Sequence, residues 1–322
     1  MKRRDFITVL GGTVAVWPLA SRAQKPRKWR VGFLHPGESS AHLSTRIDAF
    51  RDGLGAPGGD AEIVARFANE QLGKLPAMAV ELVDQNVEAI CAVGPPAVFA
   101  ARAATRSTPI IALDLESNPV ANGWVASLAH PGANVTGVFL DLPAFNAKSL
   151  QLLREAVPTL TKAAVLWHPA SGDLQLEAVR KAASALSVTL EVFEVSRTSD
   201  FGSTFQAVAR AQVGGVLMLS APLFNSNPQL LADLTLQGRL PSINIFPDFA
   251  RKGGLMAYGP EIHSLFMQAG VMTRKVLQGA ATAEFPVERP VRFKLVVNLK
   301  AARALNVTLP TSVLLSVDET IE

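Results

Sequence analysis

Two short apolar runs of the sequence end in the same dipeptide, His-Pro. They are Arg30–Gly37 (RVGFLHPG) and Ala163–Ala170 (AAVLWHPA). Proline cannot donate to a β-ladder, and it disfavours a helical conformation at the residue before it. Each run therefore predicts a strand, buried on both faces, that opens into a turn.

The similarity continues beyond this pair. Val87–Pro96 (VEAICAVGPP) is similar to Val213–Pro222 (VGGVLMLSAP), and Pro109–Asp114 (PIIALD) is similar to Pro241–Asp248 (PSINIFPD). In all three pairs the prolines are separated by nearly the same length of chain. This recurring spacing indicates a duplicated βα unit, although buried parallel strands also resemble one another in composition without duplication.

Helical segments, Val120–Leu128 among them, alternate with the strands, which predicts an α/β protein with parallel, doubly wound sheets. A chain of 322 residues exceeds the usual length of one core, so we expect two lobes. Segments left over after both lobes predict three hinge crossings, near 138–141, 257–260 and 287–292. We expect the first lobe to span 27–138 plus 259–288, and the second to span 139–258 plus 289–322.

Residues 1–23 have the pattern of an export signal. Met1–Arg4 is basic, Phe6–Ala20 is apolar, and Ser21-Arg22-Ala23 places small residues before a cleavage point. The apolar stretch is too short and too rich in glycine to span a bilayer as a stable helix. Arg3–Ile7 (RRDFI) resembles a twin-arginine motif, and the general secretion route is the alternative. We expect a periplasmic protein that is soluble after signal cleavage.

The composition argues against a nucleic-acid partner. The predicted signal contributes most of the formal net charge of +4, because residues 1–23 include four Lys or Arg residues and one Asp. The mature chain is then almost neutral, and 48% of the whole sequence is apolar while 18% is charged. These values suit a compact α/β protein and not a basic nucleic-acid binder. We expect no nucleic-acid partner, and a monomer.

The sequence contains no recognisable catalytic or cofactor motif. It has no G-x-S-x-G elbow, no P-loop, no H-E-x-x-H and no G-x-G-x-x-G after a strand. The single cysteine, Cys91, lies within a predicted strand and is expected to be a small buried residue. We therefore expect no enzyme activity, no cofactor and no metal.

Ligands of doubly wound sheets bind beyond the carboxyl ends of the strands, where polar residues collect in this sequence. The candidate ligand-binding residues at these predicted ends are His35, Ser39, Ser40, Gly94, Pro95, Pro96, Asp114 and Glu116 in the first lobe, and His168, Ser220, Phe224, Asp248, Phe249 and Tyr258 in the second.

Asp114 and Glu116 are two residues apart after a strand, so both carboxylates can project to one side and hold an ammonium or a hydroxyl. A solvated loop pair is the alternative. Phe224, Phe246, Phe249 and Tyr258 together favour a ligand with an apolar body, although core packing is the better explanation for each phenylalanine alone. A histidine before proline, such as His35 or His168, is also commonly structural.

Several longer stretches resemble a known family, the substrate-binding proteins of ABC transporters, whose relatives include candidates for tryptophan import. The matching stretches are Gly94–Ala97, Asn118–Gly137 (NPVANGWVASLAHPGANVTG), Gly253–Gly259 (GGLMAYG), Phe285–Leu299 (FPVERPVRFKLVVNL), Ala301–Leu309 and Asp318–Glu322. The chain departs from the family pattern at Asn118, Trp124, His130 and the pair Trp167-His168. These departures bear on the identity of the ligand more than on the fold.

The resemblance implies a type I periplasmic-binding-protein fold, no catalysis, a ligand held between the lobes and an ABC permease as partner. We expect a small amphiphilic solute, such as an aromatic or branched amino acid. Backbone N–H groups near Ser39–Ser40 and Pro96 would meet its carboxylate. Asp114 or Glu116 would meet its ammonium. The alternatives are an exported sensory module of the same fold, an exported hydrolase or lyase, and a cytosolic sugar-responsive repressor, which the signal and the lack of a helix-turn-helix disfavour.

Overall fold

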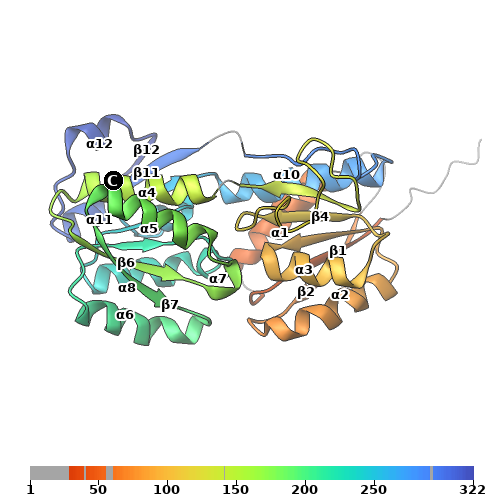
Figure 1. Ribbon diagram of the computed structural model, residues 1–322, viewed down its shortest axis with the longest axis horizontal. Helices are drawn as coiled ribbons and strands as arrows, with labels where there is room; N and C mark the ends of the chain where they lie inside the picture. The colour runs from red at the N-terminus through yellow and green to blue at the C-terminus, as the bar shows by residue number, and fades with distance from the viewer. Residues whose placement is uncertain (1–28, 40, 56–60, 141, 291–292) are drawn as a thin grey trace, which may run out of the picture.

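The computed structural model describes residues 29–39, 41–55, 61–140, 142–290 and 293–322. They form two α/β lobes that lie side by side along the long axis of the molecule (Figure 1). Residues 1–23, expected to be an export signal, lie outside the described part of the chain.

The first lobe is built on a five-stranded parallel sheet in the order β2-β1-β3-β4-β5. Its strands are β1 (Arg30–His35), β2 (Glu62–Phe67), β3 (Ala89–Val93), β4 (Ile110–Asp114) and β5 (Val135–Phe139). Its helices are α1 (Ala41–Leu54), α2 (Leu75–Asp84) after a 3-10 turn at Leu72–Lys74, α3 (Gly94–Ala104) and α10 (Ile262–Leu277).

The second lobe has a seven-stranded sheet in the order β12-β11-β10-β9-β8-β6-β7. Its strands are β6 (Lys162–Trp167), β7 (Thr189–Glu194), β8 (Val216–Met218), β9 (Ser242–Asn244), β10 (Met256–Gly259), β11 (Lys294–Asn298) and β12 (Glu319–Ile321). Its helices are α4 (Leu142–Ala156), α5 (Leu174–Leu186), α6 (Phe201–Arg210), α7 (Pro222–Asn225), α8 (Pro228–Gln237), α9 (Pro247–Arg251), α11 (Leu299–Ala304) and α12 (Thr311–Leu315), with 3-10 turns at Pro169–Ser171 and Thr198–Asp200.

The strand order of the first sheet recurs in the second. β7-β6-β8-β9-β10 repeats β2-β1-β3-β4-β5, and the two strands that end in His-Pro, β1 and β6, occupy equivalent positions. The predicted fold class, two parallel doubly wound lobes, is confirmed. Only the pairing of β10 with β11 is antiparallel among the described strands, because β11 enters the second sheet from the opposite direction.

Both faces of each sheet are covered by helices. In the first lobe, α1 and α10 bury Phe33, Phe50 and Phe266 on one face, while α2 and α3 cover the other. In the second lobe, α4 and α5 cover one face, and α6 and α8 cover the other. Strands buried on both faces explain why their sequences are almost continuously apolar.

Helices α1 and α10 touch through their backbones. A Cβ at Gly270 would overlap the carbonyl oxygen of Phe50 and lie 2.9 Å from the Cα of Gly53. A Cβ at Gly53 would overlap the carbonyl oxygen of Met267 in the same way. The absence of side chains at both positions allows this close packing.

The chain passes between the two sheets three times, between β5 and α4, between β10 and α10, and between Glu288 and β11. The third passage lies beside both of the others. Phe139 N donates to Glu288 O (3.0 Å) and Glu288 N donates to Gly137 O (2.9 Å) on the first-lobe side. On the second-lobe side, β11 pairs with β10.

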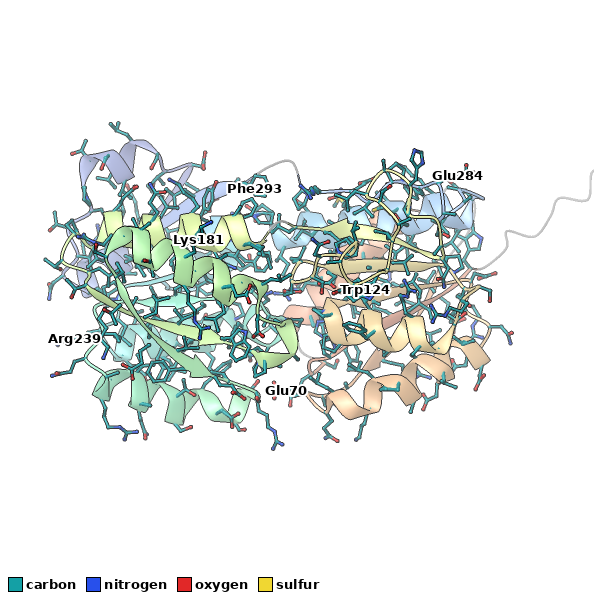
Figure 2. The ribbon with its side chains drawn as sticks, viewed as in Figure 1. Glu70, Trp124, Lys181, Arg239, Glu284 and Phe293 are labelled. Atoms are coloured by element: carbon teal, nitrogen blue, oxygen red, sulfur yellow. The ribbon has the colours of Figure 1, made fainter. Side chains whose placement is uncertain are left out.

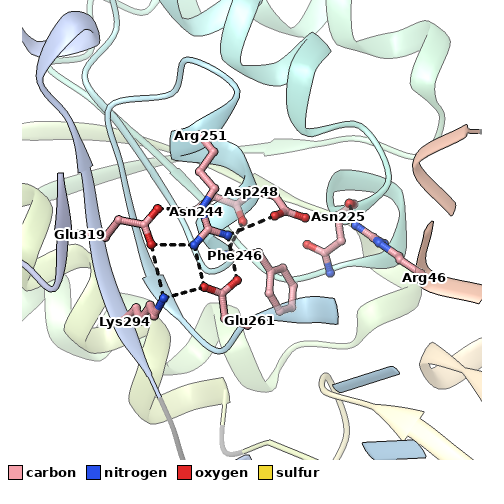
Figure 3. A network of polar contacts seen from close by, with 9 residues as sticks. All are labelled: Arg46, Asn225, Asn244, Phe246, Asp248, Arg251, Glu261, Lys294 and Glu319. Atoms are coloured by element: carbon pink, nitrogen blue, oxygen red, sulfur yellow. Dashed lines mark hydrogen bonds and ion pairs between the residues drawn. The ribbon is translucent and has the colours of Figure 1, made fainter. Parts of the chain in front are cut away.

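A charged cluster surrounds the second and third passages (Figure 3). Arg251, at the end of α9, makes paired hydrogen bonds to Glu261 (2.7 and 2.9 Å) and to Glu319 (2.7 and 2.8 Å). Lys294 Nζ lies 3.2 Å from Glu261 and 3.4 Å from Glu319. The cluster therefore joins the start of α10 to α9, β11 and β12.

The prediction of a helix at Val120–Leu128 is wrong. Asn118 Oδ1 accepts hydrogen bonds from the backbone N–H groups of Val120 and Ala121 (both 3.1 Å), Gly123 has a φ of +64°, and the segment forms successive turns. These turns wrap around Trp124, which is buried and packs edge-on against Phe99 with the ring centroids 5.0 Å apart. Asn118 begins a single turn, and Gly123, in the left-handed conformation, ends it before a helix can continue.

The close approach of α1 and α10 leads to a prediction. Gly270→Ala should lower the free energy of unfolding by about 2–3 kcal/mol, because the helices must separate to admit the methyl group. Gly202→Ala, in α6, is the matched control, since a Cβ there meets nothing within 4 Å. That variant should gain about 0.5–1 kcal/mol from helix propensity. Urea denaturation of both variants tests this, and equal effects would contradict the role assigned to Gly270.

The charged cluster leads to a prediction in acid. Hydrogen bonds from Arg251 lower the pKa of Glu319 to about 2 from an ordinary value of 4.5. The resulting stabilisation is present above pH 4.5 and is lost as the pH falls through 2. Arg251→Gln should therefore cost about 1 kcal/mol of unfolding free energy at pH 7 and progressively less towards pH 2. Arg51→Gln, which removes an exposed pair with Asp48, is the control. A cost for Arg251→Gln that does not change with pH would exclude this coupling.

Candidate functional site

The carboxyl ends of the strands in the two lobes face one another. Gly94, the first residue of α3, has a φ of +73°, and a Cβ there would lie 2.7 Å from Pro222 Cγ at the start of α7. Glycine thus permits both the turn after β3 and the close approach of the lobes. The strand-end loops of β1, β3 and β4 meet those of β6 and β8 at this point.

Two acidic side chains lie at the end of β4, and both are buried. Asp114 Oδ1 accepts hydrogen bonds from the backbone N–H groups of Glu116 (2.9 Å) and Ser117 (3.1 Å). Glu116 Oε1 accepts a hydrogen bond from Ser220 Oγ (2.7 Å), which belongs to the other lobe. Burial raises the pKa of Asp114 to about 6. Burial and the charge of Asp114 raise the pKa of Glu116 to about 8.

A chain of amides holds Ser220 in place. Ser220 N donates to Gln175 Oε1 (2.8 Å), and Gln175 Nε2 donates back to Ser220 O (2.9 Å). Asn146 Nδ2 also donates to Gln175 Oε1 (2.8 Å), and Asn225 Nδ2 donates to Ser220 Oγ (3.2 Å). These four residues are buried, so helices α4, α5 and α7 together fix the hydroxyl that reaches Glu116.

A small cavity lies between β1, β4, α1, α10 and α7. Its polar lining is His35, Arg46, Glu116 and Asn225, and its apolar lining includes Leu115, Leu265 and Phe266. Arg46 reaches from α1 of the first lobe to the backbone carbonyl oxygen of Asn225 in the second, to which it donates a hydrogen bond (Figure 3).

Four buried polar atoms at this interface have no hydrogen-bond partner: His35 Nε2, Asp114 Oδ2, Asn225 Oδ1 and Ser226 Oγ. Two come from each lobe. A buried polar group without a partner is costly, so atoms of this kind need partners that a bound ligand or an ordered water can supply.

A second contact between the lobes lies at their outer edge, where Figure 2 shows Glu70. Thr198 N donates to Glu70 Oε2 (2.9 Å), and the Thr198 hydroxyl donates to Glu70 Oε1. Glu70, Pro96 and His168 line a small neighbouring cavity, to which residues of both lobes contribute. The lobes are therefore closed against each other.

The candidate residues from the sequence fall into two groups. The structure brings His35, Gly94, Asp114, Glu116 and Ser220 together at the interface, with Pro96 and His168 at the neighbouring cavity. His168 Nδ1 accepts from Ala170 N (3.0 Å), and burial lowers its pKa.

The other candidates lie elsewhere. Ser39 is exposed, Pro95 is buried in the first turn of α3, and Ser40 is outside the described residues. Asp248 differs from these, because it lies 3.6 Å from Arg251 and its charge also acts on Arg46 of the first lobe. The backbone nitrogen of Pro96 carries no hydrogen, so it donates nothing to a carboxylate.

The aromatic candidates do not form a wall of the cavity at Arg46. Phe224 and Phe249 are fully buried in the second lobe's core, where Phe224 packs against Phe201 with the centroids 6.0 Å apart. Tyr258 stacks on Phe145 at 5.8 Å beside β11. Apolar side chains of the first lobe, Phe266 among them, line that cavity instead.

Sequence reasoning missed Arg46, Asn225 and Gln175. Arg46 has a signal in the sequence, because it precedes Phe50 by one helical repeat of four residues and therefore lies on the inner face of α1. Asn225 and Gln175 have no such signal in the sequence, since their roles depend on contacts with Ser220 that only the fold creates.

Two features are absent from the described part of the chain. No three His, Cys, Asp or Glu side chains come together there as ligands for a metal. No helix in the described ranges combines the length and apolar character needed to cross a bilayer.

Residues 39–321 match the family model described as "ABC transporter substrate binding protein". A tyrosine-binding protein of Clostridioides difficile is 24% identical over 267 residues, which cover 81% of this chain and 75% of that protein. The ABC domain from Streptococcus pneumoniae in complex with L-Trp has a TM-score of 0.80 and 23% identity, covering 92% of this chain and 100% of its own. A ligand-free, open substrate-binding protein with adhesive properties from Clostridium difficile has a TM-score of 0.60 and 21% identity, covering 91% and 100%.

The raised pKa of Glu116 leads to a prediction. Since the folded chain holds this proton up to about pH 8 and the unfolded chain releases it near pH 4.5, the unfolding free energy should fall as the pH rises from 4.5 to 8. Glu116→Gln keeps an acceptor for Ser220 and removes the titration. It should flatten this decline by about 2–4 kcal/mol. Urea denaturation at pH 5, 6.5 and 8 measures it, and parallel curves for the two proteins would count against a protonated Glu116.

Proposed function

The chain belongs to the family of ABC transporter substrate-binding proteins, and on that premise we propose that it captures a small amphiphilic amino acid by closing its two lobes around it. The family consists of solute-binding proteins and not of enzymes, so a hydrolase or lyase is excluded. The amino acid is aromatic or branched in this proposal, and the complex is delivered to a permease for import.

The observation that carries the proposal is the set of buried polar atoms without partners at the interface. Asp114 Oδ2 and Asn225 Oδ1 are hydrogen-bond acceptors, one from each lobe. An ammonium group offers three donors, and it would satisfy such acceptors. Asp114 and Glu116 supply the negative charge that an ammonium needs, and its arrival would favour their ionised forms.

The apolar side of the cavity supports the choice of an amphiphilic ligand. Leu115, Leu265 and Phe266 line it from the first lobe. Two similar proteins point in the same direction, since one is described as tyrosine-binding and another was solved with L-Trp. The aromatic or branched side chain would pack on this wall, where burial of its surface stabilises the complex.

Closure of the lobes explains how the protein signals that it is loaded. Contacts such as Glu116–Ser220 and Glu70–Thr198 join one lobe to the other, so they exist only in the closed form. A ligand that binds both lobes shifts the population towards that form, which a permease would then recognise. The higher TM-score with the L-Trp complex than with the open, ligand-free structure agrees with closed lobes. In this proposal the protein is exported to the periplasm and acts as a monomer.

A ligand screen tests the function. Thermal melting of the purified protein with each of the twenty amino acids, and with neutral sugars, should show an increase for an aromatic or branched amino acid. At a ligand concentration of about 100 times Kd, the stabilisation should be about 2.7 kcal/mol. Calorimetric titration would then give a stoichiometry of one ligand per chain. Melting that responds to sugars and to no amino acid would overturn the proposal.

A further inference from the structure

We propose that Glu116 determines which ligands the lobes can close around, because closure requires a positive charge beside the buried pair of Asp114 and Glu116. An amino acid brings this charge with its ammonium group. A hydroxy acid with the same side chain closes the lobes only together with a proton. The inference rests on the proposed function, and it names the residue that separates amino acids from the corresponding hydroxy acids.

The two carboxyl groups are buried together among neutral hydrogen-bond donors. Asp114 is 0% exposed and Glu116 is 4% exposed. Asp114 Oδ1 accepts from two backbone N–H groups, and Leu115 N donates to Glu116 Oε2 (3.3 Å). Among the described residues, no lysine or arginine forms an ion pair with either carboxyl group. Two like charges in a buried site oppose each other, so burial favours a proton on one of them.

The second lobe creates this burial when the lobes close. Ser220 Oγ donates to Glu116 Oε1 (2.7 Å), and Pro222 and Asn225 line the same cavity. Separation of the lobes removes these three neighbours and returns the carboxylate to water. Closure therefore moves Glu116 into surroundings where burial and the charge of Asp114 raise its pKa to about 8 from an ordinary value of 4.5. A proton or another positive charge has to accompany it.

Two basic residues line the cavity at Glu116, namely His35 on β1 and Arg46 on α1. Burial, and secondly the charge of Arg46, lower the pKa of His35 to about 3, so its ring is neutral. Arg46 is charged, but it donates to the carbonyl oxygen of Asn225, and its charge interacts with that of Asp248 on α9. The residues that α7 and α10 contribute to the cavity are uncharged. The acidic pair therefore takes its positive charge from a ligand or from the solvent.

An outer cavity gives Glu116 a route to the solvent. Glu116 lines it together with Asn118 and Arg289, and both of these residues are exposed. Arg289 lies in the third passage and is the other charged residue along this cavity. Water screens its charge because the residue is exposed. A proton can therefore pass between Glu116 and the solvent when one ligand replaces another.

The test compares ligands that differ only at the ammonium group. L-Tyrosine, L-tryptophan, L-phenylalanine and L-leucine are titrated calorimetrically into the wild-type protein at pH 6.5 and at pH 8.5. Each is compared with the α-hydroxy acid of the same side chain, such as L-phenyllactate for L-phenylalanine. The pKa values of His35 and His168 lie below the ordinary 6.5, so neither histidine changes its charge over this range.

The advantage of an amino acid over its hydroxy acid should grow about twentyfold from pH 6.5 to pH 8.5. Only the hydroxy-acid complex holds a proton on Glu116, and that proton is lost as the pH rises through about 8. The ratio of the two affinities compares two closed complexes of the same protein. It therefore does not depend on how open the lobes are before binding.

Two substitutions locate the effect. Glu116→Gln keeps an acceptor for Ser220 and removes the titration, so the advantage of the amino acid should no longer change with pH. Glu70→Gln is the matched control, because Glu70 also accepts a hydrogen bond from a hydroxyl of the other lobe, that of Thr198. The control should keep the twentyfold change, since Glu70 lies at the outer edge of the interface.

The outcomes separate the two proposals. An equal advantage at both pH values, or a hydroxy acid without detectable binding even at pH 6.5, would overturn the role of Glu116 and leave amino-acid capture intact. A Glu116→Gln protein that keeps the twentyfold change would do the same. The wild-type comparison needs no substitution, so it decides the matter even if a variant does not fold. If none of the four amino acids binds, the proposed function fails, and the role of Glu116 fails with it.

Discussion

The site depends on the backbone contact between α1 and α10. The helices can approach this closely because Gly53 and Gly270, at the crossing, have no side chains. Helix α1 carries Arg46, α10 carries Leu265 and Phe266, and both cover the face of β1 that includes Phe33. If larger residues held the helices apart, the guanidinium would move away from Asn225 and from the ring of Phe266. The close packing of α1 on α10 in the first lobe thus determines whether Arg46 can reach the second lobe.

The interface between the lobes buries polar groups, and this makes closure depend on how those groups are satisfied. Glu116, Ser220, Gln175 and Asn225 form a connected set of hydrogen bonds, while atoms of His35, Asp114 and Asn225 lack partners. Burying unpaired polar atoms costs free energy, so closed lobes gain from a ligand that completes the set. Apolar packing also crosses the boundary, because the core cluster of the first lobe includes Leu142, Ile245 and Phe246 of the second lobe.

Much of the fold could be predicted from the sequence, because buried parallel strands and the prolines that end them are local signals. The repeated His-Pro strands became β1 and β6 at equivalent positions of two sheets with the same order. The predicted helix at Val120–Leu128 does not form because Gly123, with a positive φ, ends the turn that Asn118 begins. At the site, the strand ends pointed to Asp114, Glu116 and Ser220, and hydrogen bonds join these three residues in the structure. Periodicity could not tell whether Phe224 faces the core or the interface, since both surroundings are apolar, and it gave no reason to choose Gln175.

The return of α10 to the first lobe has a consequence for the order of synthesis. One face of the first sheet, with Val31, Phe33 and Ile111, is covered by α1 and by α10, and α10 ends at Leu277. During translation the ribosome must therefore complete almost the whole second lobe before α10 can cover this face of the first sheet. Until then an apolar surface is open to chaperones or to other chains. Contacts between such distant segments also slow folding itself. A chain of this topology reaches its native state only when its synthesis is nearly finished.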